Sequence, residues 1–297
     1  MRQLLLFILT LTISLADAAI TIGRGPVAGQ DNAATPNVYY QEFQDWSHAD
    51  LRALDGSGGA GGRYNFNDGF DDGRDLTAFY SRIEGDNLYL RVDLYDLKLG
   101  QENANLDVYV AIDCKPSQGA DFFPDFTDVK VLPIRQWERC IALYNASAFN
   151  VYKADYTTDN GSFLGSYYNA ELDSVEFGIR LQSLRDAGWD PNAVNELDRL
   201  LYFTVITVKD GSNGGAGEIA GAASDATDAF FDDERGFTDN VINGVIASNA
   251  TAGRAKYATI AHGNQSVNKN NDTRVHIFDP TTTVSYTHLT LPTNREV

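Results

Sequence analysis

Hydrophobic and polar residues alternate along several short stretches in the middle of the chain. In residues 88–94, three leucines and a valine fall on one face, while Tyr89, Arg91 and Asp93 fall on the other. This period of two is typical of a β-strand with one buried face. The same pattern repeats in residues 106–113 and 175–181. We therefore expect several half-buried strands.

Turn-forming residues separate these stretches. Residues 84–87, Glu-Gly-Asp-Asn, join the alternating runs 76–83 and 88–94, which are expected to pair as a β-hairpin. Residues 201–208 are apolar on both faces, which is typical of a central strand. Further strands are predicted at residues 129–134, 140–144, 149–154 and 163–169.

Helical patterns are rare in the sequence. Only residues 182–187, which Gly188 follows, and residues 193–200 have one. Many short strands with turn signals between them and little helix predict an all-β fold. The specific expectation is an antiparallel β-sandwich of the jelly-roll or immunoglobulin-like kind.

The first 18 residues have a composition of their own. Arg2 is followed by an apolar run over residues 4–15 and then by Ala16, Asp17 and Ala18. These features are typical of a secretory signal peptide cleaved after Ala18. The alternatives are a membrane anchor or a buried helix, but the run is shorter than the roughly 20 residues that span a bilayer. We expect a secreted or cell-surface protein without a membrane span.

The other end of the chain has an unusual sequence. Residues 284–293, VSYTHLTLPT, resemble the translation of a transposase-type sequencing adapter, and a natural Thr-rich tail is the alternative. The expected organisation is therefore a signal peptide at 1–18, a linker at 19–34, a sandwich module at 35–250, the truncated start of a further domain at 251–283, and an adapter-derived artefact at 284–297.

Composition narrows the choice of partners. The 297 residues include 41 acidic and 23 basic side chains, which gives a net charge of −18. A protein that neutralises phosphates needs clustered Lys and Arg, and this chain has no basic stripe, so nucleic acid is not an expected partner. Hydrophobic residues make up 43% of the chain, enough for a core, which excludes global disorder.

The chain has two cysteines, Cys114 and Cys140. In an exported protein an isolated pair usually forms a disulfide, so we predict a structural bridge between them. Two free buried thiols and a metal-binding pair are the alternatives.

Three segments resemble the DOMON-like β-sandwich modules found in glucodextranase and other amylolytic enzymes. They are residues 69–79 (GFDDGRDLTAF), 87–92 (NLYLRV) and 106–113 (LDVYVAID). The resemblance covers about residues 35–250 and implies sugar binding, or an accessory role beside a catalytic domain. Related modules that bind haem need a His or Met axial ligand. Only His48 precedes residue 262, and Met1 leaves with the signal peptide, so haem is not expected.

Sugar binding needs aromatic faces that stack on pyranose rings and polar groups that bind the hydroxyls. The candidate aromatic residues include two tyrosines on the polar faces of their strands, and the alternative for each is an ordinary core or surface role. The candidates are Trp46, Tyr64, Trp137, Tyr167 and Tyr168, with Tyr89 and Tyr109.

An acidic loop over residues 65–75 is the second chemical signal. Its carboxylates offer the hard oxygen ligands that Ca²⁺ prefers, although the loop lacks the EF-hand spacing. The predicted ligands are Asp68, Asp71, Asp72 and Asp75, and solvated turn residues are the alternative. A second acidic run surrounds Asp228.

Residues 255–261 form a short strand pattern that ends in His262, with Gln265 close behind. A His at the end of a strand is where (β/α) barrels place functional residues. The arrangement is similar to the first region of glycoside hydrolase family 57, which implies that His262 and Gln265 contact sugar; a loop histidine is the alternative. Ser266 stands where that family has a proline.

The sequence thus favours the carbohydrate-binding-type accessory module of a truncated secreted enzyme that acts on α-glucans. The two carboxyl groups needed for hydrolysis would lie beyond residue 283, so we expect no catalysis from this chain. The competing hypothesis is a structural or adhesion sandwich without a ligand, whose aromatic residues would be scattered or buried.

Overall fold

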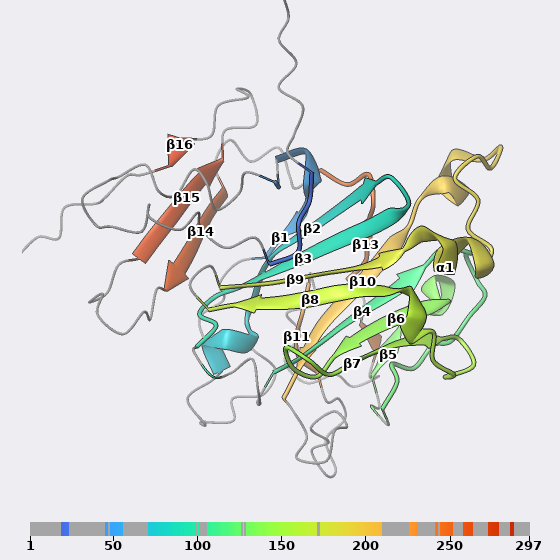
Figure 1. The fold of residues 1–297 in the computed structure, drawn as a ribbon, viewed down its shortest axis with the longest axis horizontal. Coiled ribbons are helices and arrows are strands. Elements are labelled where there is room, and N and C mark those ends of the chain that lie inside the picture. Colours follow the sequence, from blue (N-terminus) through green and yellow to red (C-terminus); the bar gives the residue numbers. More distant parts are fainter. Residues whose placement is uncertain are drawn as a thin grey trace, which may run out of the picture.

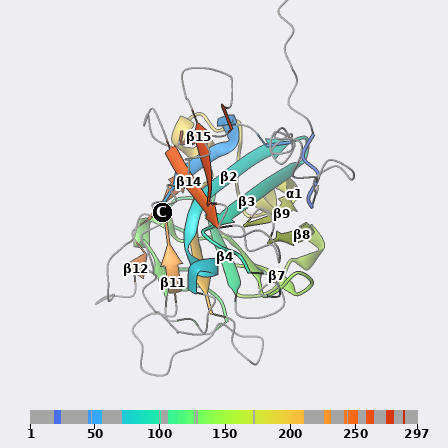
Figure 2. The same cartoon turned by 90° about the vertical axis from the view of Figure 1, so that its left-hand side faces the viewer.

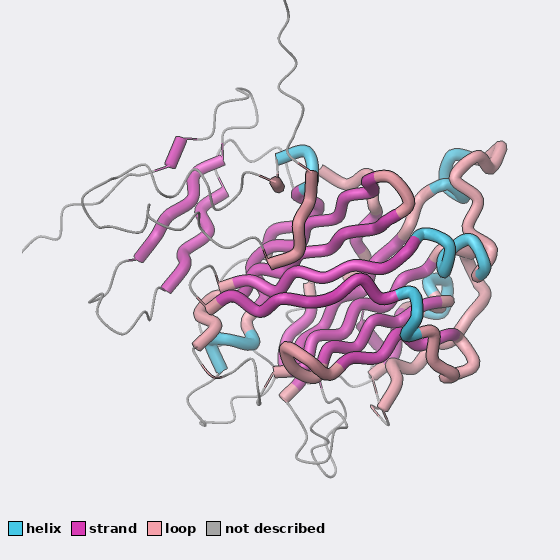
Figure 3. Tube along the Cα trace, in the orientation of Figure 1, coloured by secondary structure: helices cyan, strands magenta, loops and turns pink. Residues whose placement is uncertain are grey.

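The computed structural model describes residues 19–23, 45–46, 48–55, 71–98, 100, 106–125, 127, 129–170, 173–209, 226–230, 241–242, 244–251, 258–263, 273–278 and 286–287. Strands dominate this part of the chain, and the helices in it are short (Figure 3). The prediction of an all-β chain with antiparallel sheets is therefore confirmed.

The first sheet contains five antiparallel strands in the order β1-β2-β3-β9-β8. Its strands are β1 (Leu51–Leu54), β2 (Leu76–Glu84), β3 (Asn87–Leu94), β8 (Phe163–Asn169) and β9 (Ser174–Arg180). The predicted hairpin is β2–β3, in which Glu84 pairs with Asn87 across Gly85 at a φ of 57°. Glycine adopts this left-handed conformation without steric cost.

The second sheet has the order β11-β10-β4-β6-β7, and β13 also pairs with β10. Its strands are β4 (Asp107–Asp113), β6 (Arg139–Leu143), β7 (Phe149–Lys153), β10 (Tyr202–Val208), β11 (Ala226–Ala229) and β13 (Ile246–Ala247). All seven residues of β10 are buried. The prediction that residues 201–208 form a central strand is confirmed.

Smaller elements connect or flank the sheets. The short helices are η2 (His48–Asp50), η3 (Asp71–Arg74), η5 (Pro133–Arg135), η6 (Asn160–Ser162), α1 (Leu181–Asp186) and η7 (Glu196–Arg199). The remaining strands are β5 (Lys130–Val131), β12 (Val241–Ile242), β14 (Ala258–Gly263), β15 (Thr273–Phe278) and β16 (Tyr286–Thr287). The strand predicted at 129–134 is short because Pro133, which has no N–H to donate, starts a 3₁₀ turn.

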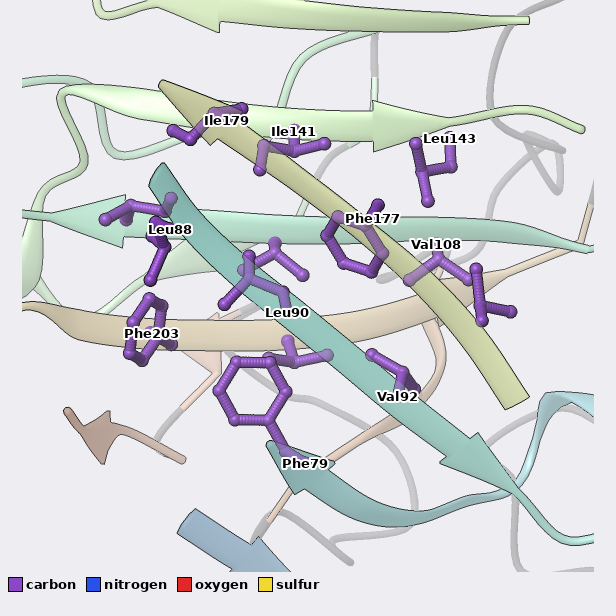
Figure 4. Close-up of a cluster of buried hydrophobic side chains, with 14 of the residues drawn as sticks. Phe79, Leu88, Leu90, Val92, Val108, Ile141, Leu143, Phe177, Ile179 and Phe203 are labelled. Atoms are coloured by element: carbon purple, nitrogen blue, oxygen red, sulfur yellow. The ribbon is translucent and has the colours of Figure 1, made fainter. Parts of the chain in front are cut away.

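The two sheets stack face to face (Figures 1 and 2). Strands β3 and β9 cross over β4, β6 and β10, and apolar side chains from both layers fill the space between them (Figure 4). Alternation along each strand sends every second residue into this core. Its members include Phe79, Leu88, Leu90, Val92, Val108, Ile141, Phe177 and Phe203.

A second core lies on the outer face of the second sheet. The segment from Cys114 to Trp137 crosses this face and buries Phe123 and Trp137 against the sheet. The strand residues beneath it are small, namely Ala111, Cys140 and Ala142. Because small side chains leave space above the sheet, the crossing segment can pack closely against it. This second core positions the site described below.

The outer face of the first sheet is covered by two N-terminal pieces. Ile20 and Trp46 pack there, and the Glu176 carboxylate accepts hydrogen bonds from Gly23 N (3.0 Å) and Trp46 Nε1 (3.2 Å). Beneath them the buried Arg91 pairs with Asp93, at 2.6 Å between Nε and Oδ1. Residues 24–34, the rest of the predicted linker, lie outside the described residues.

The predicted disulfide between Cys114 and Cys140 is wrong. Both cysteines are free and buried. Cys114 continues the inward-facing series of β4 and joins the core between the sheets, whereas Cys140 pairs with Ala111 and faces the outer core. A disulfide requires Cβ atoms about 3.8 Å apart that point toward each other. Side chains on opposite faces of a sheet do not meet this requirement.

The thiol state gives a direct prediction. Under denaturing, non-reducing conditions the chain should release two reactive thiols, and in the native state both should react slowly because they are buried. A reducing agent should leave Tm unchanged. Missing thiols in the denatured chain, together with a Tm that falls on reduction, would show that a bridge forms.

Glu138 is a buried acid between β4 and β6. Its Oε2 accepts hydrogen bonds from the backbone N–H groups of Cys114 (2.9 Å) and Lys115 (3.2 Å), while Oε1 has no hydrogen-bond partner among the described residues. Burial raises the pKa of Glu138 to about 7, and the neighbouring Asp113 also raises it. The folded chain therefore binds this proton more tightly than the unfolded chain does.

This shift predicts a pH dependence of stability. Because the folded pKa lies above the unfolded value of roughly 4.3, the free energy of unfolding should fall as pH rises through that window and level off above pH 7. Glu138→Gln keeps an acceptor for both N–H groups, so it should stabilise the chain at alkaline pH by up to about 3 kcal/mol and change little at acidic pH. Chemical denaturation across the pH range measures this. An equal effect of the substitution at every pH would contradict it.

Candidate functional site

A pocket of about 390 Å³ opens where the crossing segment meets the edge of the second sheet. Most of its lining is apolar, and one carboxylate lies in its wall. The lining residues are Phe122, Phe123, Pro124, Asp125, Thr127, Tyr152 and Tyr156, and we call it the Asp125 pocket.

A small hairpin forms one wall of the pocket. Ala120 pairs with Trp137 and Phe122 pairs with Lys130, both antiparallel, so the chain turns around Pro124 and Asp125. The Thr127 hydroxyl donates to the carbonyl of Phe123 at 3.0 Å and closes the tip. The tip is therefore held by its own hydrogen bonds above the sheet.

The edge strand β7 and the turn after it form the opposite wall. Tyr152 lies on β7, and Tyr156 lies in a tight turn that Asp155 stabilises by accepting from Thr157 N (3.0 Å). The Tyr156 hydroxyl donates to the Phe122 carbonyl at 3.2 Å. The Trp137 ring packs edge-on against Tyr156, with the ring centroids 5.6 Å apart. Trp137 thus supports the pocket from below.

Three tyrosine hydroxyls converge on the Asp125 carboxylate. Tyr144 and Tyr109 donate to Oδ2 at 2.5 and 3.1 Å, and Tyr152 donates to Oδ1 at 2.6 Å. Asn150 Nδ2 donates to the hydroxyl oxygens of Tyr144 (3.1 Å) and Tyr152 (2.8 Å). We call Asp125, the three tyrosines and Asn150 the tyrosine–carboxylate cluster.

Strand register brings this cluster together. Tyr109 on β4 lies opposite Ala142 on β6, and Ala142 lies opposite Asn150 on β7. Residues in register across neighbouring antiparallel strands share a face of the sheet. Because Ala142 has a small side chain, it leaves space above the sheet. The tyrosine rings extend through this space to Asp125.

The tyrosines of the cluster are strongly held in their protonated form. Burial raises the pKa of Tyr152 to about 12, and its hydrogen bond to Asp125 adds to the increase. Burial also raises the pKa values of Tyr109 and Tyr144, whose hydroxyls lie against the same carboxylate. All three are therefore hydrogen-bond donors to Asp125 over the whole physiological pH range.

Two residues that line the pocket have an unusual backbone. Asp125 has a φ of 65° and Tyr156 a φ of 63°. Asp visits this left-handed region readily, but a bulky side chain such as Tyr is uncommon there and costs about 1–3 kcal/mol. Such strain often marks functional sites, so the conformation of Tyr156 identifies this wall of the pocket as a candidate functional site.

Charges of both signs surround the pocket. Lys130 Nζ lies 4.5 Å from the centroid of the Phe122 ring, a cation–π contact. On the other side, burial and the nearby Asp121 carboxylate raise the pKa of Tyr156. The site therefore combines accessible aromatic rings with carboxylate oxygens.

The sequence-predicted aromatic candidates do not form a common binding surface. Trp46, Trp137, Tyr109 and Tyr168 are buried. The prediction that Trp46 and Trp137 stack on sugar is wrong because their rings are 4% and 0% exposed. Both belong to packed cores instead, where Trp46 Nε1 donates to Glu176 and Trp137 Nε1 donates to the Phe122 carbonyl.

Among the other candidates, Tyr167 is 40% exposed on β8 in the first sheet, on a different sheet from the Asp125 pocket. Tyr89 packs partly buried against Trp46 and its neighbours. Tyr64 lies outside the described residues.

The predicted calcium ligands are only partly described. Asp68 and the side chain of Asp71 lie outside the described residues. The backbone carbonyl of Asp72 accepts from Asp75 N and Asp96 N, which ties the acidic loop to the end of β3. No group of three or more His, Cys, Asp or Glu that could hold a metal is found in the described part of the chain. Calcium binding stays a prediction.

His262 lies on β14, in register with Arg274 on the antiparallel strand β15. A (β/α)-barrel strand pairs with parallel neighbours, so this pairing does not confirm the start of a barrel. Gln265 lies outside the described residues.

Sequence reasoning missed Phe122, Asp125, Tyr152 and Tyr156. The local signal was residues 121–125, Asp-Phe-Phe-Pro-Asp, in which apolar rings and carboxylates alternate around a turn former. A pair of adjacent phenylalanines in an acidic turn is a feature that a search for binding aromatics could include, and here Phe122 is exposed while Phe123 is buried.

Comparisons with known proteins give no family for this chain. No protein-family model matches it, and no curated protein matches its sequence. In the described part of the chain, no helix has the length and apolar character required to cross a membrane.

The tyrosine–carboxylate cluster predicts a specific stability effect. Tyr144→Phe removes a donor to the partly buried carboxylate of Asp125 and should lower the free energy of unfolding by about 1–3 kcal/mol. Tyr202→Phe is the matched control, since among the described residues its hydroxyl donates at 3.5 Å to the Leu197 carbonyl alone. Urea denaturation of both variants measures the difference. Equal stability of the two variants would show that the cluster contributes nothing.

Proposed function

We propose that the chain is a carbohydrate-binding module and that the Asp125 pocket holds the sugar. The proposal depends on one observation: accessible aromatic side chains surround a carboxylate held in place by three tyrosines. Pyranose rings present C–H faces that stack on aromatic rings and hydroxyl groups that donate to carboxylates. The pocket offers both kinds of group within one concave surface.

Exposure and size support the proposal. Phe122 is 37% exposed and Tyr156 is 45% exposed, so both rings can contact a ligand. The volume of about 390 Å³ lies within the usual range for small-molecule sites, roughly 300–1,000 Å³. The cluster beneath is preorganised, which lowers the entropic cost of binding.

The wider role follows from the sequence analysis. As an all-β module of the DOMON-like kind, the chain would serve as the accessory part of a secreted carbohydrate-active enzyme whose catalytic carboxylates lie elsewhere. The burial of Trp46, Trp137, Tyr109 and Tyr168 is the one observation that favours the competing structural or adhesion module. The two functions differ in whether the pocket binds sugar.

Calorimetric titration of the full chain with soluble oligosaccharides, including malto-oligosaccharides, tests the proposal. Tyr156→Asn removes the ring, its hydrogen bond to the Phe122 carbonyl and its contact with Trp137, while Asn tolerates the left-handed backbone. The folded variant should bind about tenfold more weakly, a loss of about 1.4 kcal/mol. Tyr167→Ala removes an exposed ring on the other sheet and should bind as the unchanged chain does. Absence of binding to every sugar, or an equal loss in both variants, would contradict the proposal.

A further inference from the structure

The described side chains that line the Asp125 pocket can accept hydrogen bonds from a ligand but have no proton left to donate to one. Each tyrosine hydroxyl carries one proton. Tyr152 gives its proton to Asp125, and Tyr156 gives its proton to the Phe122 carbonyl. The Thr127 hydroxyl donates to the Phe123 carbonyl. No described side chain that lines the pocket therefore has a proton left to donate to a ligand.

Acceptor capacity does remain. A carboxylate offers about four acceptor positions, two on each oxygen. The three tyrosine hydroxyls are divided unequally between the two oxygens of Asp125. Among the described residues, Oδ2 accepts from Tyr109 and Tyr144, whereas Oδ1 accepts from Tyr152 alone. One acceptor position on Oδ1 is therefore left for a donor, and Asp125 lines the pocket together with Phe122, Tyr152 and Tyr156.

This combination suits a cation better than a neutral group. A carboxylate attracts a positive charge, and charge-assisted hydrogen bonds are roughly twice as strong as neutral ones. Aromatic faces attract ammonium groups through their quadrupole. The contact of Lys130 with Phe122 shows this attraction within the chain itself. A net charge of −18 also favours the approach of cations.

We infer that the Asp125 pocket binds sugars that carry a protonated amine, that is, amino sugars such as glucosamine units, in preference to neutral sugars. The amine donates to Asp125 Oδ1 while the ring stacks on the aromatic wall. The inference rests on the proposed function, because it takes the ligand to be a carbohydrate. It adds the chemical class of the sugar.

A substitution of Lys130 tests whether the Asp125 pocket is the place where the amino sugar binds. Its ammonium group lies 4.5 Å from the centroid of the Phe122 ring, which lines the pocket, so it should repel a cation bound there. Lys130→Gln should therefore strengthen binding of an amino sugar about threefold and leave a neutral sugar unchanged. Lys115→Gln changes the net charge equally at an exposed site near Gly188, and should change neither affinity. This control separates a local effect from the general attraction of an acidic protein for cations.

The test uses the full chain and three β-1,4-linked disaccharides that differ only in the substituent at C2 of each ring: those of glucosamine, N-acetylglucosamine and glucose. Titration at mildly acidic pH, where the amine is protonated, should give an affinity for the glucosamine disaccharide about tenfold above that for the other two. Asp125→Asn should abolish the preference, and Lys130→Gln gives a second readout if the Asn variant is unstable.

The outcomes separate the two proposals. Equal or tighter binding of the neutral disaccharides overturns the preference for amino sugars and leaves the carbohydrate-binding function in place. Equal gains from Lys130→Gln and Lys115→Gln also overturn the inference, since the pocket would not then be the site. Binding of none of the three overturns both the inference and the proposed function.

Discussion

The carboxylate of Asp125 is the interaction on which the candidate site depends. It accepts hydrogen bonds from the hydroxyl groups of Tyr109 on β4, Tyr144 just after β6 and Tyr152 on β7. Asp125 itself lies at the tip of a hairpin that belongs to none of these strands. The carboxylate of Asp125 is partly buried, and a carboxylate shielded from water needs hydrogen-bond donors for its oxygens. The three donors therefore fix the hairpin tip to the sheet, and the fixed tip gives the pocket its shape.

The two-sheet architecture provides what this interaction requires. The core between the sheets fixes the strands, and the alternation of β4 leaves Tyr109 and Ala111 on the outer face. Small residues on β6 then allow the crossing segment to approach closely. The strained backbone of Tyr156 fits the same account, because its stabilising contacts with Trp137 and Phe122 hold an aromatic ring at the pocket wall. The contacts of Tyr156 with Trp137 and Phe122 thus stabilise the fold and also shape the candidate binding site.

The sequence predicted the strands well and the site poorly, for identifiable reasons. Alternation is a local property, so the hairpin β2–β3 and the central strand β10 could be predicted from neighbouring residues alone. The face of Cys140 depends on its register with Ala111, about thirty residues away, and no local pattern gives it. The same holds for the convergence of Tyr109, Tyr144 and Tyr152 on Asp125. The sequence predicts that Trp46 and Trp137 lie at a binding surface. This prediction fails because local sequence does not show which segments cover the faces of a sheet.

Asp125 accepts three tyrosine protons, and the described side chains that line the pocket are left with acceptors only. Nuclear magnetic resonance of the chain labelled at tyrosine measures this directly through the hydroxyl protons. We expect slowly exchanging, downfield hydroxyl signals for Tyr109, Tyr144 and Tyr152, which persist when a ligand binds. Hydroxyl protons that exchange freely with water at these three positions would contradict it.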